Sequence, residues 1–152
     1  MKKINSEIEL INKDVDFELI PLTQAVHSVH DVQAICKCEA SEVIKTLIFI
    51  GSNPVIVVLP GDKRASIAKI EEATGERGLH MAKPAEVLTL TGYVVGSVSP
   101  FGINSKIKQI ADNSILALPS LFIGSGESDV LIKINQAEFA KSFRGIFASI
   151  SD

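Results

Sequence analysis

The stretch TLIFIGSNPVIVVLPGD, residues 46–62, contains the two clearest strands of the chain. Thr46–Ile50 and Val55–Leu59 are almost wholly apolar and rich in β-branched residues, a composition that favours extended strands. The residues GSNP at 51–54 are typical of a turn, and Pro60-Gly61-Asp62 ends the second run. We therefore expect a hairpin-like pair of strands here.

Short helices and strands are predicted on both sides of this pair. Phe139, Phe143 and Phe147 are spaced by four and indicate an amphipathic closing helix. The predicted helices cover residues 5–13, 32–38, 66–74, 85–90 and 137–147, with one more turn at 41–44. The predicted strands outside the pair cover residues 17–21, 25–30, 80–82, 115–118, 121–123 and 130–134. This mixture argues against a purely parallel doubly wound sheet and predicts a mixed α/β fold of the α+β type.

Length and composition predict one domain that spans residues 1–152. Hydrophobic residues make up 46% of the chain and aromatic residues only 5%, so the core must consist mainly of Ile, Val, Leu and Ala. The formal net charge of −3 excludes a basic field over the whole molecule. DNA is therefore not an expected partner, although a local basic patch is compatible with this charge.

The chain lacks the features of membrane and secreted proteins. No apolar run approaches the ~20 residues that a spanning helix needs, and residues 1–14 lack the apolar stretch of a secretory signal. Cys36 and Cys38 are too few and too close for a disulfide scaffold. We therefore expect a cytoplasmic protein in a reducing compartment, with no membrane partner.

Four candidate zinc ligands occur close together, as His27-x-x-His30 and Cys36-x-Cys38. Their spacing matches no common zinc motif. The two histidines lie three apart on a predicted strand and so point to opposite faces, and the two cysteines diverge on a predicted helix. We therefore expect no metal and no cofactor.

Two further features are a candidate nucleophile and a candidate anchor for a substrate. Gly124-Ser125-Gly126 lacks the Gly-x-Ser-x-Gly spacing of a nucleophile elbow, so a tight turn between strands is the simpler interpretation. Lys45 directly precedes an apolar strand, where a charge is costly unless it is paired or lies at the mouth of a pocket. Such a lysine can hold a carbonyl, carboxylate or phosphate, or be a solvated residue that flanks the strand.

The loop Gly96–Pro100 is the other candidate for chemistry. Three glycines and one proline within residues 92–102 indicate a bent backbone that can approach a ligand closely. Exposed N–H groups in such a loop can stabilise an anion or a developing oxyanion, although a plain connection fits the spacing as well. Lys106 and Lys108, just downstream, can meet phosphates or be solvated.

Four segments occur in the order found in one protein family, namely Val43–Phe49, Val57–Asp62, Thr91–Gly102 and Ile110–Asp112. On these segments the chain, from about residue 5 to its end, resembles the YbaK/prolyl-tRNA editing-domain family, which also occurs as an insertion domain of bacterial prolyl-tRNA synthetases. The lysine before an apolar strand and the Gly-x-x-x-Pro loop are weak signals alone but specific together. The resemblance implies a strongly curved mixed β-sheet with flanking helices.

The resemblance also implies a trans-editing aminoacyl-tRNA deacylase, which hydrolyses the ester between a wrong amino acid and its tRNA. The expected substrate is alanine or cysteine on the tRNA for proline, because a second sieve is needed where a synthetase pocket cannot reject an amino acid by binding alone. The implied partners are the acceptor end of an aminoacyl-tRNA and prolyl-tRNA synthetase or another synthetase. No metal is implied, and the attacking group would be water or a hydroxyl or thiol of the substrate.

Matched residue by residue, the catalytic positions that the resemblance implies are Lys45, Gly96 and Pro100. Lys45 would position the aminoacyl group and the terminal adenosine. The backbone of Gly96–Pro100 would polarise the ester carbonyl or hold the α-amine. The positions implied to bind substrate are Ser97, Val98, Ser99, Gly102, Asp112, Gly124 and Gly126.

The chain departs from the family pattern at two places. Ser97 stands where the loop most often has a second glycine, so its side chain would narrow the pocket or offer a hydroxyl. The turn Gly126–Asp129 carries two acids, which leaves the amino acid removed open and argues against tRNA contact there. These acids and a pI near 5.6 favour an alternative, a non-catalytic member that binds a small ligand, a nucleotide end or a protein. The presence of Lys45 with Gly96 and Pro100 favours the deacylase.

Overall fold

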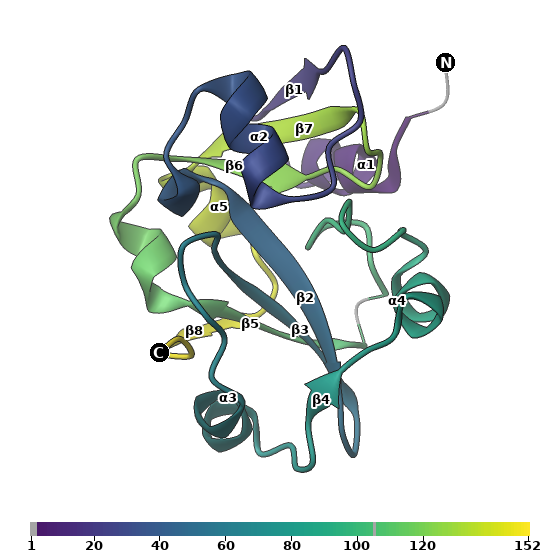
Figure 1. The fold of residues 1–152 in the computed structure, drawn as a ribbon, viewed down its shortest axis with the longest axis vertical. Coiled ribbons are helices and arrows are strands. Elements are labelled where there is room, and N and C mark those ends of the chain that lie inside the picture. Colours follow the sequence, from purple (N-terminus) through teal and green to yellow (C-terminus); the bar gives the residue numbers. More distant parts are fainter. Residues whose placement is uncertain (1–2, 105) are drawn as a thin grey trace.

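The computed structural model describes residues 3–104 and 106–152, and its larger β-sheet has five strands in the order β4-β2-β3-β5-β8. These strands are β4 (His80–Met81), β2 (Ile44–Ile50), β3 (Pro54–Pro60), β5 (Lys108–Asp112) and β8 (Ile146–Ala148). The central hairpin β2–β3 is antiparallel, whereas β5 runs parallel to both β3 and β8. The sheet is therefore mixed (Figure 1).

A smaller antiparallel sheet, in the order β1-β7-β6, lies at the top of Figure 1. Its strands are β1 (Glu18–Pro21), β7 (Val130–Asn135) and β6 (Ser120–Gly124). An isolated parallel bridge between Val43 and Phe122 connects it to the start of β2. The predicted mixed α/β fold is confirmed, and the expected single curved sheet is resolved as two sheets that this bridge joins.

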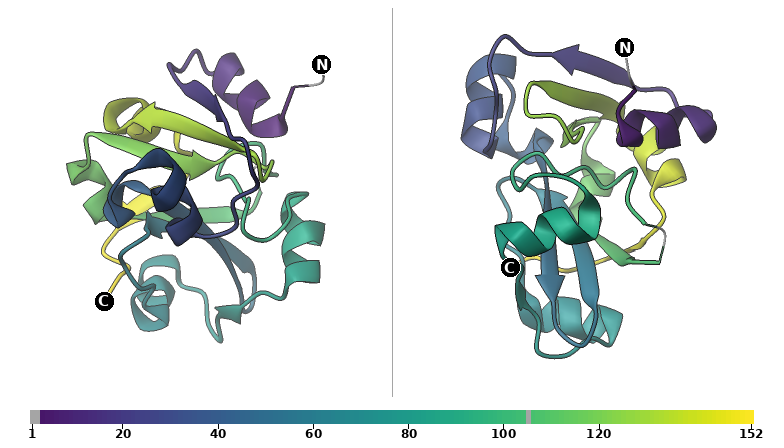
Figure 2. Two further views of the ribbon diagram at one scale, coloured as in Figure 1. Left: turned by 45° about the horizontal axis from the view of Figure 1, so that its top comes forward. Right: turned by 90° about the vertical axis from the view of Figure 1, so that its right-hand side faces the viewer.

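Five α-helices and two 3-10 turns surround the sheets in the described residues (Figure 2). The helices are α1 (Asn5–Asn12), α2 (Val29–Cys36), α3 (Ile67–Thr74), α4 (Pro84–Thr91) and α5 (Gln136–Ser142), and the 3-10 turns are Ala40–Glu42 and Asn113–Ala117. Helix α3 packs at the far end of the hairpin from α2 and the smaller sheet. Within the described ranges, none of the helices has both the length and the apolar character needed to span a bilayer.

Strand β3 is buried on both faces and organises the core. Residues Val55–Leu59 have no exposed surface. Ile56 and Val58 face the main cluster between the two sheets, and the alternate residues of β3 face a second cluster that contains Ile70 of α3. Because full burial of such a side chain contributes about 1.5–3 kcal/mol, this strand holds the larger sheet between two apolar layers.

The predicted strand at 25–30 is wrong, because the chain enters a helix there. Ser28 is the N-cap of α2, and its Oγ accepts a hydrogen bond from the Asp31 N–H at 3.1 Å. The Asp31 carboxylate accepts in turn from the His27 N–H at 3.0 Å. This reciprocal capping starts the helix at Val29, three residues before the predicted start.

Two later predictions are also wrong. Residues 115–118 fall in and just after the 3-10 turn Asn113–Ala117, and the strand lies before them as β5. The closing helix ends at Ser142 instead of 147, because Phe143 is extended and Ile146–Ala148 pair with β5 as strand β8. Phe139, Phe143 and Phe147 still contact one another, with ring centroids 5.3–6.3 Å apart, so their spacing reflected an aromatic cluster and not one helix.

Glu76, which follows α3, ties the β2–β3 turn to the start of β5. Its side chain is buried and accepts hydrogen bonds from Ser52 Oγ and, at 3.0 Å, from Lys108 Nζ. The hydrogen bond from Ser52 and then that from Lys108 lower the pKa of Glu76 from 4.5 to about 2, against the opposing effect of desolvation. The ionised carboxylate therefore stabilises the folded state.

The pH dependence of stability tests this contact. Because the pKa in the folded state lies below that of the unfolded chain, the contribution of Glu76 is present above pH 4.5 and is lost as the pH falls toward 2. We expect Glu76→Gln to lower the free energy of unfolding in urea at neutral pH and to flatten its decline below pH 4.5. Glu72→Gln, at an exposed position on α3, is the control. Equal pH slopes in the two variants would contradict the assignment.

Candidate functional site

A pocket of about 280 Å³ lies where five chain segments meet. Its lining consists of residues 26–29 and Val32 at and before the start of α2, residues 43–47 of β2 and the segment before it, Val95, Gly96 and Val98 of the loop 95–98, residues 122–124 of β6, and Leu131 of β7. Most of the lining side chains are apolar. Small-molecule pockets cover roughly 300–1,000 Å³, so this pocket fits a small group better than a large ligand.

Lys45 is the one cationic side chain that lines this pocket among the described residues. It is partly buried and forms no ion pair or hydrogen bond with them. Burial lowers the pKa of Lys45 from its ordinary value, and the charge of Asp62 opposes this shift without cancelling it. The pocket therefore contains a partly desolvated ammonium group that can bind a carbonyl or an anion.

The pocket lies along a free edge of β2. Gly61 N–H donates to Val43 O at 2.7 Å, which makes the odd-numbered residues of β2 the hydrogen-bonded partners of β3. The N–H and C=O of Thr46 therefore point to the opposite edge, where β4 pairs with Phe49 and Ile50 and the Ala82 N–H donates to Ile48 O at 2.9 Å. The Thr46 hydroxyl is buried without a hydrogen-bond partner among the described residues. This edge can supply hydrogen bonds to a ligand.

The loop 95–98 closes the opposite side of the pocket and is held at two close approaches. Gly96 has a φ of +93°, and a Cβ placed there would lie 3.1 Å from the His27 carbonyl oxygen. A Cβ on Gly124 would lie 2.4 Å from the Val98 carbonyl oxygen. Only glycine fits these positions without movement of the backbone. The Gly126 N–H also donates to Ser97 O at 2.8 Å, so β6 and the turn after it fix the loop.

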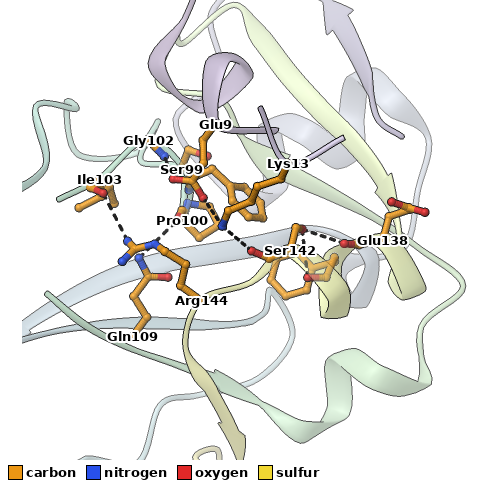
Figure 3. A network of polar contacts seen from close by, with 12 residues as sticks. Glu9, Lys13, Ser99, Pro100, Gly102, Ile103, Gln109, Glu138, Ser142 and Arg144 are labelled. Carbon is orange, nitrogen blue, oxygen red and sulfur yellow. Dashed lines mark hydrogen bonds and ion pairs between the residues drawn. The ribbon is translucent and has the colours of Figure 1, made fainter. Parts of the chain in front are cut away.

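The loop continues through residues 100–103, and three side chains hold this second half in place (Figure 3). Glu9 of α1 accepts from the Gly102 N–H at 2.8 Å, Gln109 Nε2 donates to Pro100 O at 3.3 Å, and Arg144 donates to Ile103 O at 3.4 Å. These anchors come from three distant parts of the chain. The backbone of the loop is therefore positioned before any ligand binds.

Lys13 extends this support to the closing helix. Its Nζ lies 2.9 Å from Glu9 Oε2 and donates to Ser142 O at 2.8 Å, at the end of α5. Figure 3 shows this chain of contacts passing from the loop through α1 to α5. The carboxylate of Glu9 is thus held in place to accept from Gly102.

Four of the ten predicted site residues line the pocket, namely Lys45, Gly96, Val98 and Gly124. The other six do not line it. Pro100, Gly102 and Gly126 lie in the loop or against it through the contacts given above. The Ser99 hydroxyl accepts from the Phe101 N–H at 3.2 Å, inside the loop.

Ser97 and Asp112 have structural contacts of their own. The Ser97 hydroxyl is buried and donates to Val94 O at 2.9 Å, so it neither narrows the pocket nor faces it. Asp112 lies at the end of β5, where it caps the following 3-10 turn. Desolvation alone would raise the pKa of Asp112, but hydrogen bonds from Ser114 and from the Ile150 N–H lower it.

The sequence patterns do not indicate three polar residues of the pocket, which are His27, Ser28 and Thr46. His27 lines the pocket beside Gly96, although its only sequence signal is a zinc-like spacing with His30. Thr46 is the one polar residue of the run Thr46–Ile50, and this is the only sequence signal that it offers. No group of three potential metal-ligating side chains occurs among residues 3–104 and 106–152.

The sequence pattern of the aminoacyl-tRNA editing domain matches residues 23–142. This chain belongs to the aminoacyl-tRNA editing domain family. The match includes the pocket with Lys45, the loop 95–98 and Gly124.

Curated relatives of the chain are proline–tRNA ligases. The enzyme from Thermotoga neapolitana is 31% identical over 113 residues, which cover 74% of this chain and 19% of the ligase. That from Geobacter sp. strain M21 is 29% identical over 112 residues, which cover 73% of this chain and 20% of the ligase. The chain thus spans about a fifth of the length of these relatives.

Two solved structures share the fold over nearly the whole chain. Hypothetical protein APE2540 has a TM-score of 0.91 and 27% identity, and the match covers 97% of this chain and 99% of that one. A candidate trans-editing enzyme for prolyl tRNA synthetase has a TM-score of 0.83 and 21% identity, with 96% and 91% covered. At its lower identity, the second shows likeness of fold alone.

The close approach at Gly96 can be tested with a matched pair of variants. Gly92 and Gly96 both have positive φ, but a Cβ on Gly92 meets nothing within 4 Å. We expect Gly92→Ala and Gly96→Ala each to lose about 1–2 kcal/mol of stability from the left-handed backbone. Only Gly96→Ala should shift the amide resonances of residues 26–28 and 45–47 in a ¹H–¹⁵N NMR spectrum. Identical spectra around the pocket in the two variants would contradict contact between the loop and His27.

Proposed function

We propose that this protein is a trans-acting aminoacyl-tRNA deacylase that hydrolyses the ester of a mischarged tRNA. The main support for this proposal is that Lys45, whose side chain is partly buried, lines the same small apolar pocket as the preformed loop at Gly96. Membership of the editing domain family names the chemistry. The size of the pocket supports an aminoacyl group as the part of the substrate that enters.

In the proposed reaction, Lys45 binds the carbonyl or an adjacent phosphate of the terminal adenosine. Backbone N–H groups of the loop 96–98 stabilise the charge that develops on the carbonyl oxygen, and the free edge of β2 at Thr46 meets the α-amine. A water molecule, or a hydroxyl or thiol of the substrate, attacks the carbonyl carbon. The ester C–O bond breaks, and the ribose oxygen of the tRNA takes up a proton. Pro100 contributes by holding the loop.

Alanine and cysteine on the tRNA for proline are the substrates we propose. Both are close to proline in size or smaller, so a synthetase pocket built for proline cannot exclude them strongly by binding alone. An apolar pocket of about 280 Å³ admits either side chain. The likeness to parts of proline–tRNA ligases supports this choice of tRNA.

A deacylation assay tests the role of Lys45. We expect the protein to hydrolyse alanyl- or cysteinyl-tRNA for proline, and Lys45→Ala to lower the rate about a hundredfold or more, the scale seen when one charge-stabilising donor is removed. Lys83→Ala, an exposed lysine outside the pocket, is the control. If well-folded protein cleaves none of a panel of aminoacyl-tRNAs, the non-catalytic binding role replaces the deacylase.

The pH profile gives a second test of the same residue. Because burial lowers the pKa of Lys45, its positive charge is lost at a lower pH than for an ordinary lysine. After correction for spontaneous hydrolysis, the rate should therefore fall on the alkaline side, and Lys45→Arg should move this fall to higher pH because arginine stays protonated. An unchanged alkaline limb in Lys45→Arg would show that another group titrates.

A synthetase is the partner we propose for tRNA selection. An acidic protein of this size offers little surface for recognition of a whole tRNA. We expect no tight gel shift with tRNA alone at physiological salt and a shift when prolyl-tRNA synthetase is added. Tight binding of tRNA by the protein alone at that salt concentration would contradict the need for a partner.

A further inference from the structure

A second concave surface, of about 420 Å³, lies between the end of α3, the start of β5 and the start of β8. We call it the basic groove. None of its lining residues lines the Lys45 pocket. Lys106, Lys108 and Arg144 line it from two segments that are almost forty residues apart in the sequence. The fold therefore gathers three cations at one place on an acidic protein.

Much of this charge is available to a ligand. Lys108 pairs with Glu76 at 3.0 Å, whereas Lys106 and Arg144 form no ion pair with the described residues. Arg144 uses one of its five N–H donors on Ile103 O, which leaves the others for a ligand. Two uncompensated positive charges thus face the basic groove.

Gln109 adds a polar residue to the lining of the basic groove and links the groove to the loop. It is 4% exposed and donates through Nε2 to Pro100 O. Its Oε1 is buried and has no hydrogen-bond partner among the described residues. A buried acceptor without a donor is costly, so this side chain is an unsatisfied polar group beside the cations of the groove.

The geometry points to a phosphate-binding site in the basic groove, and its ligand is the phosphodiester backbone of an RNA strand. Lys106 and Arg144 contact phosphate oxygens, which positions the strand without reading its sequence. An acidic peptide would also satisfy the cations, but the proposed function favours RNA because its substrate is a tRNA.

This inference rests on the proposed function, because the strand would belong to the tRNA whose 3′ end enters the Lys45 pocket. Gln109 and Arg144 line the basic groove and donate to Pro100 O and Ile103 O of the loop segment 100–103 (Figure 3). The other half of that loop lines the Lys45 pocket. Binding of RNA in the groove would therefore affect the position of the loop backbone that faces the ester in the proposed reaction.

RNA binding at low salt is the direct test. We expect fluorescently labelled, uncharged tRNA for proline to bind about tenfold more weakly to Lys106→Gln/Arg144→Gln than to the unchanged protein. The slope of log affinity against log salt should become shallower by about 1–2. The charge-matched control is Lys37→Gln/Lys83→Gln, two exposed lysines outside the groove, which should bind nearly as the unchanged protein does.

A second variant is needed because Arg144→Gln also removes the contact between Arg144 and the loop. Lys106→Glu changes an exposed side chain with no hydrogen bond to the described residues and should give the same loss of tRNA binding. Equal affinity for RNA in Lys106→Glu, in the groove double variant and in the control would overturn the proposal.

Two further experiments test whether the ligand of the groove is RNA, and separate RNA binding in the groove from ester hydrolysis. If inorganic phosphate or an acidic peptide competes as well, per charge, as an acceptor-stem RNA, the site is not an RNA site. Hydrolysis of a minimal aminoacyl-adenosine ester should be unchanged in Lys106→Glu, because that substrate lacks the strand. If no ester is hydrolysed but the groove variants still lose RNA binding, the proposed function fails while the binding site stands.

Discussion

The burial of strand β3 on both faces governs how the elements around it are arranged. Its residues Val55–Leu59 are fully buried, so both of its faces must be covered and both of its edges paired. The prolines at its two ends lack an N–H and lie opposite Ile44 and Ile50. This register leaves the odd-numbered residues of β2 bonded to β3 and turns Thr46 toward the free edge. The pocket lies where that edge is left unpaired.

The wall opposite β2 is a loop with no regular secondary structure, so its position depends on contacts from elsewhere. Glycines at 96 and 124 permit the close approaches to α2 and β6. Glu9, Gln109 and Arg144 hold the far half of the loop from three separate parts of the chain. A loop held in this way presents its N–H groups with little reorganisation, which is the condition under which backbone donors stabilise developing charge well.

The distribution of charge matters more here than its total. A net charge of −3 repels a polyanion at long range, yet Lys45 and the basic groove place positive charge at two separate sites. Salt screens the long-range repulsion within about 8–10 Å, whereas direct contacts act at shorter distance. Such an arrangement favours binding of a nucleic acid that another protein delivers. It disfavours unaided capture of the nucleic acid from solution.

Local sequence patterns were enough to predict the central hairpin, most of the short helices, the family and the two segments that carry Lys45 and the loop at Gly96. These signals are local, since β-branched runs, turn residues and motif spacing do not depend on distant contacts.

Which residues meet in space follows from the tertiary structure instead. The helix at α2 replaced a predicted strand because Ser28 and Asp31 cap it, and residues 146–148 left the closing helix to pair with β5. Ser97 was turned inward by its bond to Val94, while His27, Thr46 and Arg144 acquired roles through neighbours far away in the chain. Pairing and burial depend on partners distant in sequence, so a local pattern cannot reveal them.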